Sequence, residues 1–149
     1  MTAASYSGPW VHLAAFCNLV LKEADGTLTL VRVVDRITHT VSGAGVPIQM
    51  EPFDHSLTLV IGLKPGEARG RHNVTLNIEG PDGITRPGPT KSVTFDNEDR
   101  GVNLIMELRL QFEREGLYWF DILLNEHRLT RVPLRVVYSM TSTMGQSAP

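Results

Sequence analysis

The chain has 149 residues, of which 42% are hydrophobic and 20% are charged, and its formal net charge is −2. This length and composition are typical of one globular domain and argue against a disordered chain. The near-neutral charge gives no long-range attraction to nucleic acid or to an anionic membrane, so we expect neither as a partner.

Cysteine usage and the first residues indicate the compartment. The single cysteine, Cys17, excludes an intrachain disulfide, which is typical of proteins in a reducing compartment. The start of the chain lacks the charged residues and the continuous apolar run of a signal peptide. We therefore expect a cytoplasmic protein with one domain over residues 10–139 and flexible termini at 1–9 and 140–149.

The first two predicted strands form a hairpin. Between residues 11 and 21 every odd position is apolar, which predicts a long strand with the odd side chains facing a core. Asp25 and Gly26 then predict a tight turn, because both residues tolerate positive φ. The next strand is expected over residues 27–40. Its apolar phase changes near Val31, which predicts a β-bulge.

The middle of the chain alternates short strands with turns. Residues 42–52 contain two glycines and two prolines and are predicted to be a loop. Strands are expected over residues 57–63, 74–78 and 93–95, with turns at 64–67 and 80–83.

The last third has the most regular alternation. Apolar side chains occupy the even positions of residues 102–112 and of residues 118–124, and a final strand is expected over residues 132–138. Pro133 in that strand lacks an N–H donor, which indicates an edge or a bulge.

These patterns predict an all-β protein with about eight or nine strands. Connections this short join antiparallel strands, and sheets with one apolar face must pack those faces together. We therefore predict a single two-sheet antiparallel β-sandwich, with a closed barrel as the alternative.

Two resemblances support this fold. Residues 115–125, with Tyr118 at the start of a strand, together with residues 133–136, resemble the last strands of immunoglobulin-like domains. This resemblance implies a tyrosine corner, in which the hydroxyl bonds back to the preceding connection. The cysteine and tryptophan positions of antibody domains are absent, so a true antibody-type domain is not expected.

The chain from residue 11 to residue 138 also resembles a family of small bacterial proteins of unknown function. The similarity is carried by residues 16–18 (Phe-Cys-Asn), 35–37 (Asp-Arg-Ile) and 81–83 (Pro-Asp-Gly), and by the ending around Tyr118. It implies a fold and supplies neither an activity nor site residues.

No pattern indicates catalysis, a cofactor or a metal. The five histidines lack ligand spacing, and Cys17 lies on an apolar strand face, where burial blunts thiol reactivity. One cationic group surrounds a single turn and is a candidate anion contact, with solvated loop charge as the favoured alternative: Lys64, Arg69, Arg71 and His72.

The strongest functional indication is the presence of large apolar side chains on nominally outward strand faces. These candidate interface residues are Trp10, Phe16 and Val20 in the first strand, and Leu117, Trp119 and Leu123 opposite the inner face of the strand expected over residues 118–124. Aromatic residues are enriched at interface centres, and large exposed apolar patches are unusual on monomers. The alternative is that loops cover these residues or that a bulge shifts the strand phase.

We therefore predict a non-enzymatic binding or assembly module with a protein partner, including a second copy of itself. A small-molecule or carbohydrate-binding sandwich that uses His39, Phe53 and His55 is the alternative. An enzyme with a dispersed site is the third hypothesis.

Overall fold

The computed structural model describes residues 6–141, and within them the chain forms nine strands. The predicted all-β class is confirmed. The strands are β1 (Trp10–Lys22), β2 (Leu28–Val34), β3 (Arg36–Ser42), β4 (Phe53–Lys64), β5 (Gly70–Glu79), β6 (Thr85–Phe95), β7 (Val102–Phe112), β8 (Gly116–Leu124) and β9 (His127–Thr141). Of the termini expected to be flexible, residues 1–5 and 142–149 lie outside the described part.

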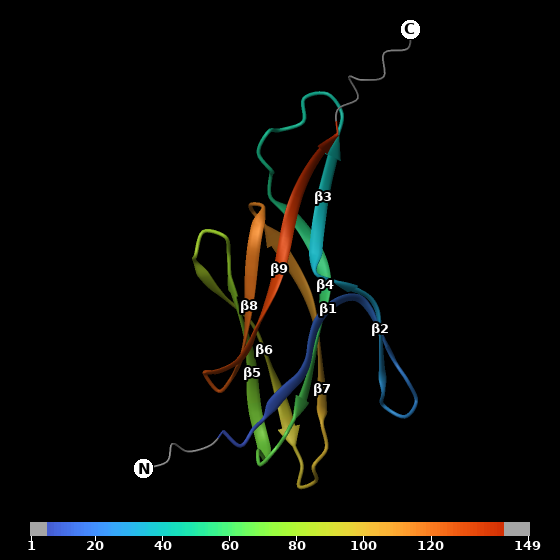
Figure 1. The fold of residues 1–149 in the computed structure, drawn as a ribbon, viewed down its shortest axis with the longest axis vertical. Coiled ribbons are helices and arrows are strands. Elements are labelled where there is room, and N and C mark those ends of the chain that lie inside the picture. The colour runs from blue at the N-terminus through green and yellow to red at the C-terminus, as the bar shows by residue number, and fades with distance from the viewer. Residues whose placement is uncertain (1–5, 142–149) are drawn as a thin grey trace.

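The strands form two sheets. Sheet A has the order β2-β1-β4-β7, and sheet B has the order β3-β9-β8-β5-β6 (Figure 1). All pairs are antiparallel except β3 and β9, which run parallel, so the expectation of a purely antiparallel fold is wrong at this pair. A tight turn dictates the direction of two consecutive strands, whereas β3 and β9 are far apart in the sequence and no short connection constrains them.

The two sheets pack face to face around one apolar core. The ring of Phe16 in sheet A meets the ring of Phe120 in sheet B, with 4.8 Å between their centroids. Phe112 and Tyr118 make a second aromatic contact between the sheets at 4.9 Å. The even positions of β7 and β8 supply many of the core side chains, as their alternation predicted. The hydroxyl of Tyr118 donates to the carbonyl of Arg114 at 2.6 Å, which is the bond expected of a tyrosine corner.

The phase of β1 differs from the prediction. A register irregularity between Val11 and Leu13 moves the inward face from odd to even positions, so Ala14 and Phe16 face the core. Phe16 is only 1% exposed, and its prediction as an interface residue is wrong. Cys17 is fully buried, but alternation places it on the opposite face of sheet A.

The predicted strand over residues 27–40 is two strands in different sheets. The chain bends at Asp35 and passes from β2 in sheet A directly into β3 in sheet B. The phase change predicted near Val31 is not a register shift, because β1 and β2 have the same register at the Phe16–Val34 pair and at the Lys22–Leu28 pair; the backbone irregularity there is a positive φ of 57° at Arg32. Apolar side chains therefore occupy both faces of this hairpin.

The far half of the β1–β2 hairpin projects from the body of the molecule (Figure 1). Pairing between β1 and β4 ends at Cys17, so beyond this residue β1 pairs only with β2. We call residues 18–31 the arm. Within residues 6–141 the structure contains no helix that has the length and apolarity to cross a membrane.

Candidate functional site

The arm carries apolar side chains that do not belong to the core. Leu19 is 51% exposed and Leu21 is 46% exposed, on the same face of the hairpin. Four further apolar side chains of the arm are only half-buried: Val20, Leu28, Leu30 and Val31. None of these six side chains contributes to the core cluster. The sequence placed Leu19 and Leu21 in the core. One feature of the sequence did indicate that these residues lie outside the core, because apolar residues occupy both faces of the predicted hairpin.

The tip of the arm is a well-formed turn. A carboxylate oxygen of Asp25 accepts hydrogen bonds from the backbone N–H of Thr27 at 3.0 Å and from its hydroxyl at 2.6 Å. These bonds lower the pKa of Asp25, because they favour the ionised carboxylate. Gly26 has a φ of 89°, as the predicted turn requires.

The apolar surface continues from the arm onto the outer face of sheet A. Val33 in β2 is 64% exposed, and Leu13, Ala15 and Ile105 on the same face are half-buried. Cys17 and Val60 are buried among these neighbours. Burial raises the pKa of the Cys17 thiol, and a backbone hydrogen bond at Leu19 offsets part of the rise. A thiol in this state is a small apolar side chain rather than a nucleophile.

The outer face of sheet B carries the second predicted interface set. Leu117, Trp119 and Leu123 all point outward from β8 and are half-buried. Arg131 of β9 lies over the Trp119 ring at 4.7 Å from the centroid. The same guanidinium donates to Asp121 at 2.7 Å and to Glu79 at 2.6 Å.

Trp10, the remaining tryptophan, lies apart from both of these surfaces. It is 47% exposed, and its ring meets the ring of Tyr6 edge-on at 5.9 Å. Tyr6 stacks on His127 at 5.5 Å, and these residues border a cavity of about 340 Å³. The Trp10 ring lies against Gly66, whose positive φ of 56° favours glycine at this position.

The predicted anion-contact group is divided between the two faces of β5 and its preceding turn. Arg69 donates to the carbonyls of Gly66 and Ala68, and Arg71 donates to the hydroxyl of Ser92. His72 points to the other face, where its ring packs near Phe95 at 5.6 Å. Lys64 is exposed at the end of β4. Because existing bonds orient both arginines and His72 faces away from Arg71, the four side chains do not converge on one point.

The residues of the alternative small-molecule hypothesis do come together. His39 and Phe53 stack face to face with 4.0 Å between centroids, and His55 meets Phe53 edge-on at 6.4 Å. Tyr138 lies beside His39 at 6.3 Å. Each stacked ring thus has one face covered by the other, and a further aromatic neighbour lies close by, Tyr138 for His39 and Phe112 at 5.6 Å for Phe53, so little ring face is left for a sugar.

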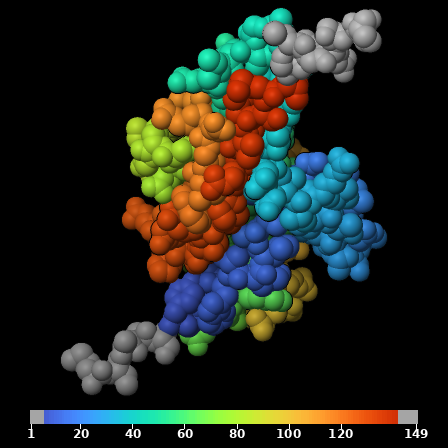
Figure 2. Space-filling model, turned by 45° about the horizontal axis from the view of Figure 1, so that its top comes forward, coloured from blue at the N-terminus to red at the C-terminus, as the bar shows by residue number. Residues whose placement is uncertain are grey.

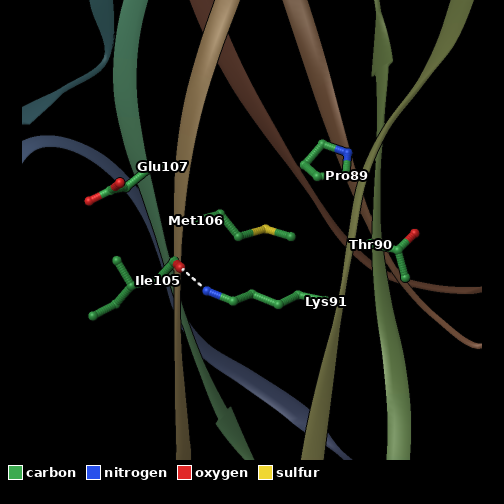
Figure 3. Close-up of a pocket in the computed structure, with 6 residues that line it drawn as sticks. All are labelled: Pro89, Thr90, Lys91, Ile105, Met106 and Glu107. Atoms are coloured by element: carbon green, nitrogen blue, oxygen red, sulfur yellow. Dashed lines mark hydrogen bonds between the residues drawn. The ribbon is translucent and has the colours of Figure 1, made fainter.

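A groove of about 530 Å³ separates the edge strands β6 and β7. Figure 3 shows Lys91 reaching across it from β6, and its ammonium donates to the Ile105 carbonyl at 2.8 Å. β7 is the end strand of sheet A, with β4 as its one strand partner among the described residues, and it therefore has a free edge. Pro87 and Pro89 lie in β6, where a missing N–H suits an edge strand. In the described part of the chain, no group of three or more His, Cys, Asp or Glu side chains is arranged to hold a metal ion.

Comparisons with known proteins give a family and a fold. No curated protein matches the sequence. A beta-glucosidase from Listeria innocua in complex with isofagomine has a similar fold, with a TM-score of 0.51 and 10% sequence identity over 94% of this chain and 18% of that chain. The same enzyme in complex with glucose gives a TM-score of 0.48 and 9% identity over 61% of this chain and 16% of that chain.

This chain therefore spans less than a fifth of the length of the beta-glucosidase chains, and at such low identity the likeness shows the fold alone. The model of DUF6941, a family of unknown function, matches residues 12–137. The expected membership of a family of unknown function is therefore confirmed, and the chain belongs to DUF6941.

Proposed function

We propose that this chain is a non-enzymatic assembly module that binds a second copy of itself through the arm. The observation that carries this proposal is an extended arm with apolar side chains on both faces and none of them in the core. Burial of apolar surface lowers the free energy by about 25 cal/mol per Å², so a partner that covers Leu19 and Leu21 is bound more tightly. An isolated two-stranded hairpin is only marginally stable in water, so contact with a partner also stabilises the arm itself.

Other features support the same function. A net charge of −2 favours a protein partner over a nucleic acid, and a single cysteine supports a reducing compartment such as the cytoplasm. The immunoglobulin-like pattern expected for the last strands also belongs to this proposal, since domains of that kind commonly present sheet faces and loops to partners.

The test is the oligomeric state of arm variants. We expect the average mass of the unmodified protein to rise with concentration by light scattering. The double variant Leu19→Ser and Leu21→Ser is expected to stay monomeric, with an unchanged circular-dichroism spectrum, because neither side chain contacts the core. Ile84→Ser is the matched control, since Ile84 is 53% exposed in the turn between β5 and β6. A double variant that associates as strongly as the unmodified protein would refute the proposal.

Carbohydrate binding is a second candidate, favoured by the exposed Trp10 ring beside its cavity. Tryptophan faces stack on sugars, and Trp10 is better placed for this than the stacked pair of His39 and Phe53. A panel of mono- and disaccharides should then raise the melting temperature of the protein but not that of a Trp10→Ala variant. The absence of any shift across the panel would remove this candidate.

A further inference from the structure

Two arginines lie side by side on the outer face of sheet B. Arg36 in β3 and Arg135 in β9 are Cα partners in the parallel pair, and both are exposed. Their neighbours Ile37, Leu134 and Val136 are buried in the core, so alternation directs both guanidinium groups outward. Among the described residues neither arginine forms an ion pair. Like charges on adjacent strands destabilise a sheet, and an anionic group placed between them removes that cost.

Apolar side chains lie directly beside this pair. Leu117 of β8 is the Cα partner of Arg135, and Trp119 is the partner of Pro133 in the next row of the same face. We call Arg36, Arg135, Leu117, Trp119 and Pro133 the basic–apolar patch. Tryptophan and arginine are the residue types that most often dominate binding energy at protein interfaces.

The surroundings of the patch favour a protein over a nucleic acid as its occupant. Arg131 lies over the Trp119 ring, so that ring face is not open to a stacking base. The charge of Arg131 is already matched by the carboxylates of Glu79 and Asp121, so this face offers few free cations to a phosphate backbone. The patch therefore fits a protein segment that presents one carboxylate next to apolar side chains.

The arm presents this combination on one of its faces. Leu19 and Leu21 share that face, and Thr29 is the Cα partner of Leu21. The Thr29 hydroxyl donates to the carboxylate of Glu23 at 3.3 Å, which holds the Glu23 carboxylate on the same side as Leu21. Lys22 points to the opposite face by alternation. The arm thus presents Leu19, Leu21 and Glu23 in one row. The two leucines are complementary to the apolar part of the patch, and the carboxylate is complementary to its two arginines.

The tip of the arm lies away from the β8 side of the patch in the same molecule, although Arg36 at the other side follows β2 directly in the chain. In Figure 1 the arm projects on the side of β3 and β1, away from β8 and β5. Figure 2 shows β8 and β9 side by side on the visible face, with the blue arm at its margin. An arm that reaches the β8 side of the patch would therefore belong to another copy.

We infer that the arm of one copy docks onto the basic–apolar patch of a second copy, with Glu23 between Arg36 and Arg135 and Leu19 and Leu21 against Leu117 and Trp119. This inference rests on the proposed function and names the surface that receives the arm. Because the contact joins two different surfaces, it differs from an arm-to-arm contact related by a two-fold axis.

Complementary variants test this arrangement. The arm-defective protein carries Leu19→Ser and Leu21→Ser, and the patch-defective protein carries Arg36→Glu and Arg135→Glu. We expect each protein alone to be monomeric by light scattering. An equimolar mixture should form one-to-one pairs, because the intact arm of the second protein meets the intact patch of the first. The matched charge control is Arg86→Glu with Arg109→Glu, two exposed arginines on β6 and β7, which should associate like the unmodified protein.

Charge exchange adds a second readout. Glu23→Arg should weaken self-association by at least tenfold, and a triple variant that combines Glu23→Arg with Arg36→Glu and Arg135→Glu should regain it, because the exchanged charges again attract each other. If the patch-defective protein fails to fold by circular dichroism, Arg36→Ala with Arg135→Ala replaces it in the equimolar mixture.

The outcomes separate the inference from the proposed function. If the arm-defective protein is monomeric but the patch-defective protein associates normally, self-association through the arm stands and the patch is not its receptor. A mixture of the two variants that remains monomeric also overturns the inference, because an intact arm and an intact patch are then both present and do not pair. Normal association of the arm-defective protein overturns both.

Discussion

At the scale of single residues, Arg131 connects three strands of sheet B. It lies in β9, donates to Asp121 in β8 and to Glu79 in β5, and covers the Trp119 ring. These hydrogen bonds raise the pKa of Arg131 above its ordinary value, because they favour the charged guanidinium. Arg135, four residues later on the same strand face, has no carboxylate partner among the described residues.

Replacement of Arg131 by methionine should lower the urea midpoint of unfolding, because it leaves Asp121 and Glu79 as neighbouring carboxylates without their shared cation. Arg135→Met is the matched control and should change the midpoint less, or raise it by relieving repulsion from Arg36. Both variants are measured at a concentration at which the protein is monomeric. Equal midpoints for the two variants would show that the Arg131 contacts add nothing to stability.

The hydroxyl of Tyr118 is a second residue with a specific stabilising role. Tyr118→Phe removes the bond to the Arg114 carbonyl and should cost about 1 kcal/mol of unfolding free energy. Tyr138→Phe removes a more exposed hydroxyl bond to the Pro47 carbonyl and should cost less. Equal costs in the two variants would contradict a special role for the corner.

Alkaline titration provides a further check on Tyr118. Burial raises the pKa of Tyr118 above the ordinary tyrosine value of about 10, and the Arg114 hydrogen bond offsets part of this rise. The folded state therefore keeps its proton at a pH where the unfolded state has lost it. The contribution of this group is complete below pH 10 and declines as the pH rises above that value. Unfolding free energy measured from pH 8 to pH 11 should fall less steeply in Tyr118→Phe, and parallel curves would contradict the assignment.

At the scale of elements, the free edge of β7 is the part of the fold most open to unwanted pairing. The side chains that share the outward direction of Ile105 include Asn103, Glu107 and Arg109, and Lys91 covers the Ile105 carbonyl. Charged side chains and prolines on edge strands hinder edge-to-edge association.

Lys91→Ala should therefore increase aggregation on mild heating, because it uncovers a backbone acceptor on a long edge strand. Lys64→Ala, at an exposed strand end without such a bond, is the control and should behave like the unmodified protein. Turbidity at fixed concentration is the measurement. Equal aggregation rates would mean that Lys91 does not protect the edge.

The elements also show which features the sequence was able to predict. Regular alternation in β7 and β8 predicted their inward residues correctly, because both strands have the core on one side and neither contains an extra residue; the register shift at Ile122 and Leu123 adds its extra residue to β9. The same reasoning failed for β1, where an irregularity near His12 reverses the inward face and the arm leaves the core altogether. Alternation reports only that apolar residues share a face, and the partner of that face depends on contacts with strands far along the chain. The parallel pairing of β3 with β9, which brings Arg36 beside Arg135, was unpredictable for the same reason.

At the scale of the whole molecule, two sheets enclose one core while a hairpin with apolar side chains extends outside it. The core accounts for the stability of the body. The apolar side chains of the arm are not part of that core. An arm that binds a second copy accounts for this division.

Hydrogen exchange across a range of protein concentrations tests this account most directly. We predict that the backbone amides of residues 19–30 exchange rapidly in dilute solution and become protected as concentration rises, while amides of β4 and β8 are protected throughout. Rapid exchange of the arm at every concentration, together with a constant monomer mass, would contradict the claim that the arm binds a second copy.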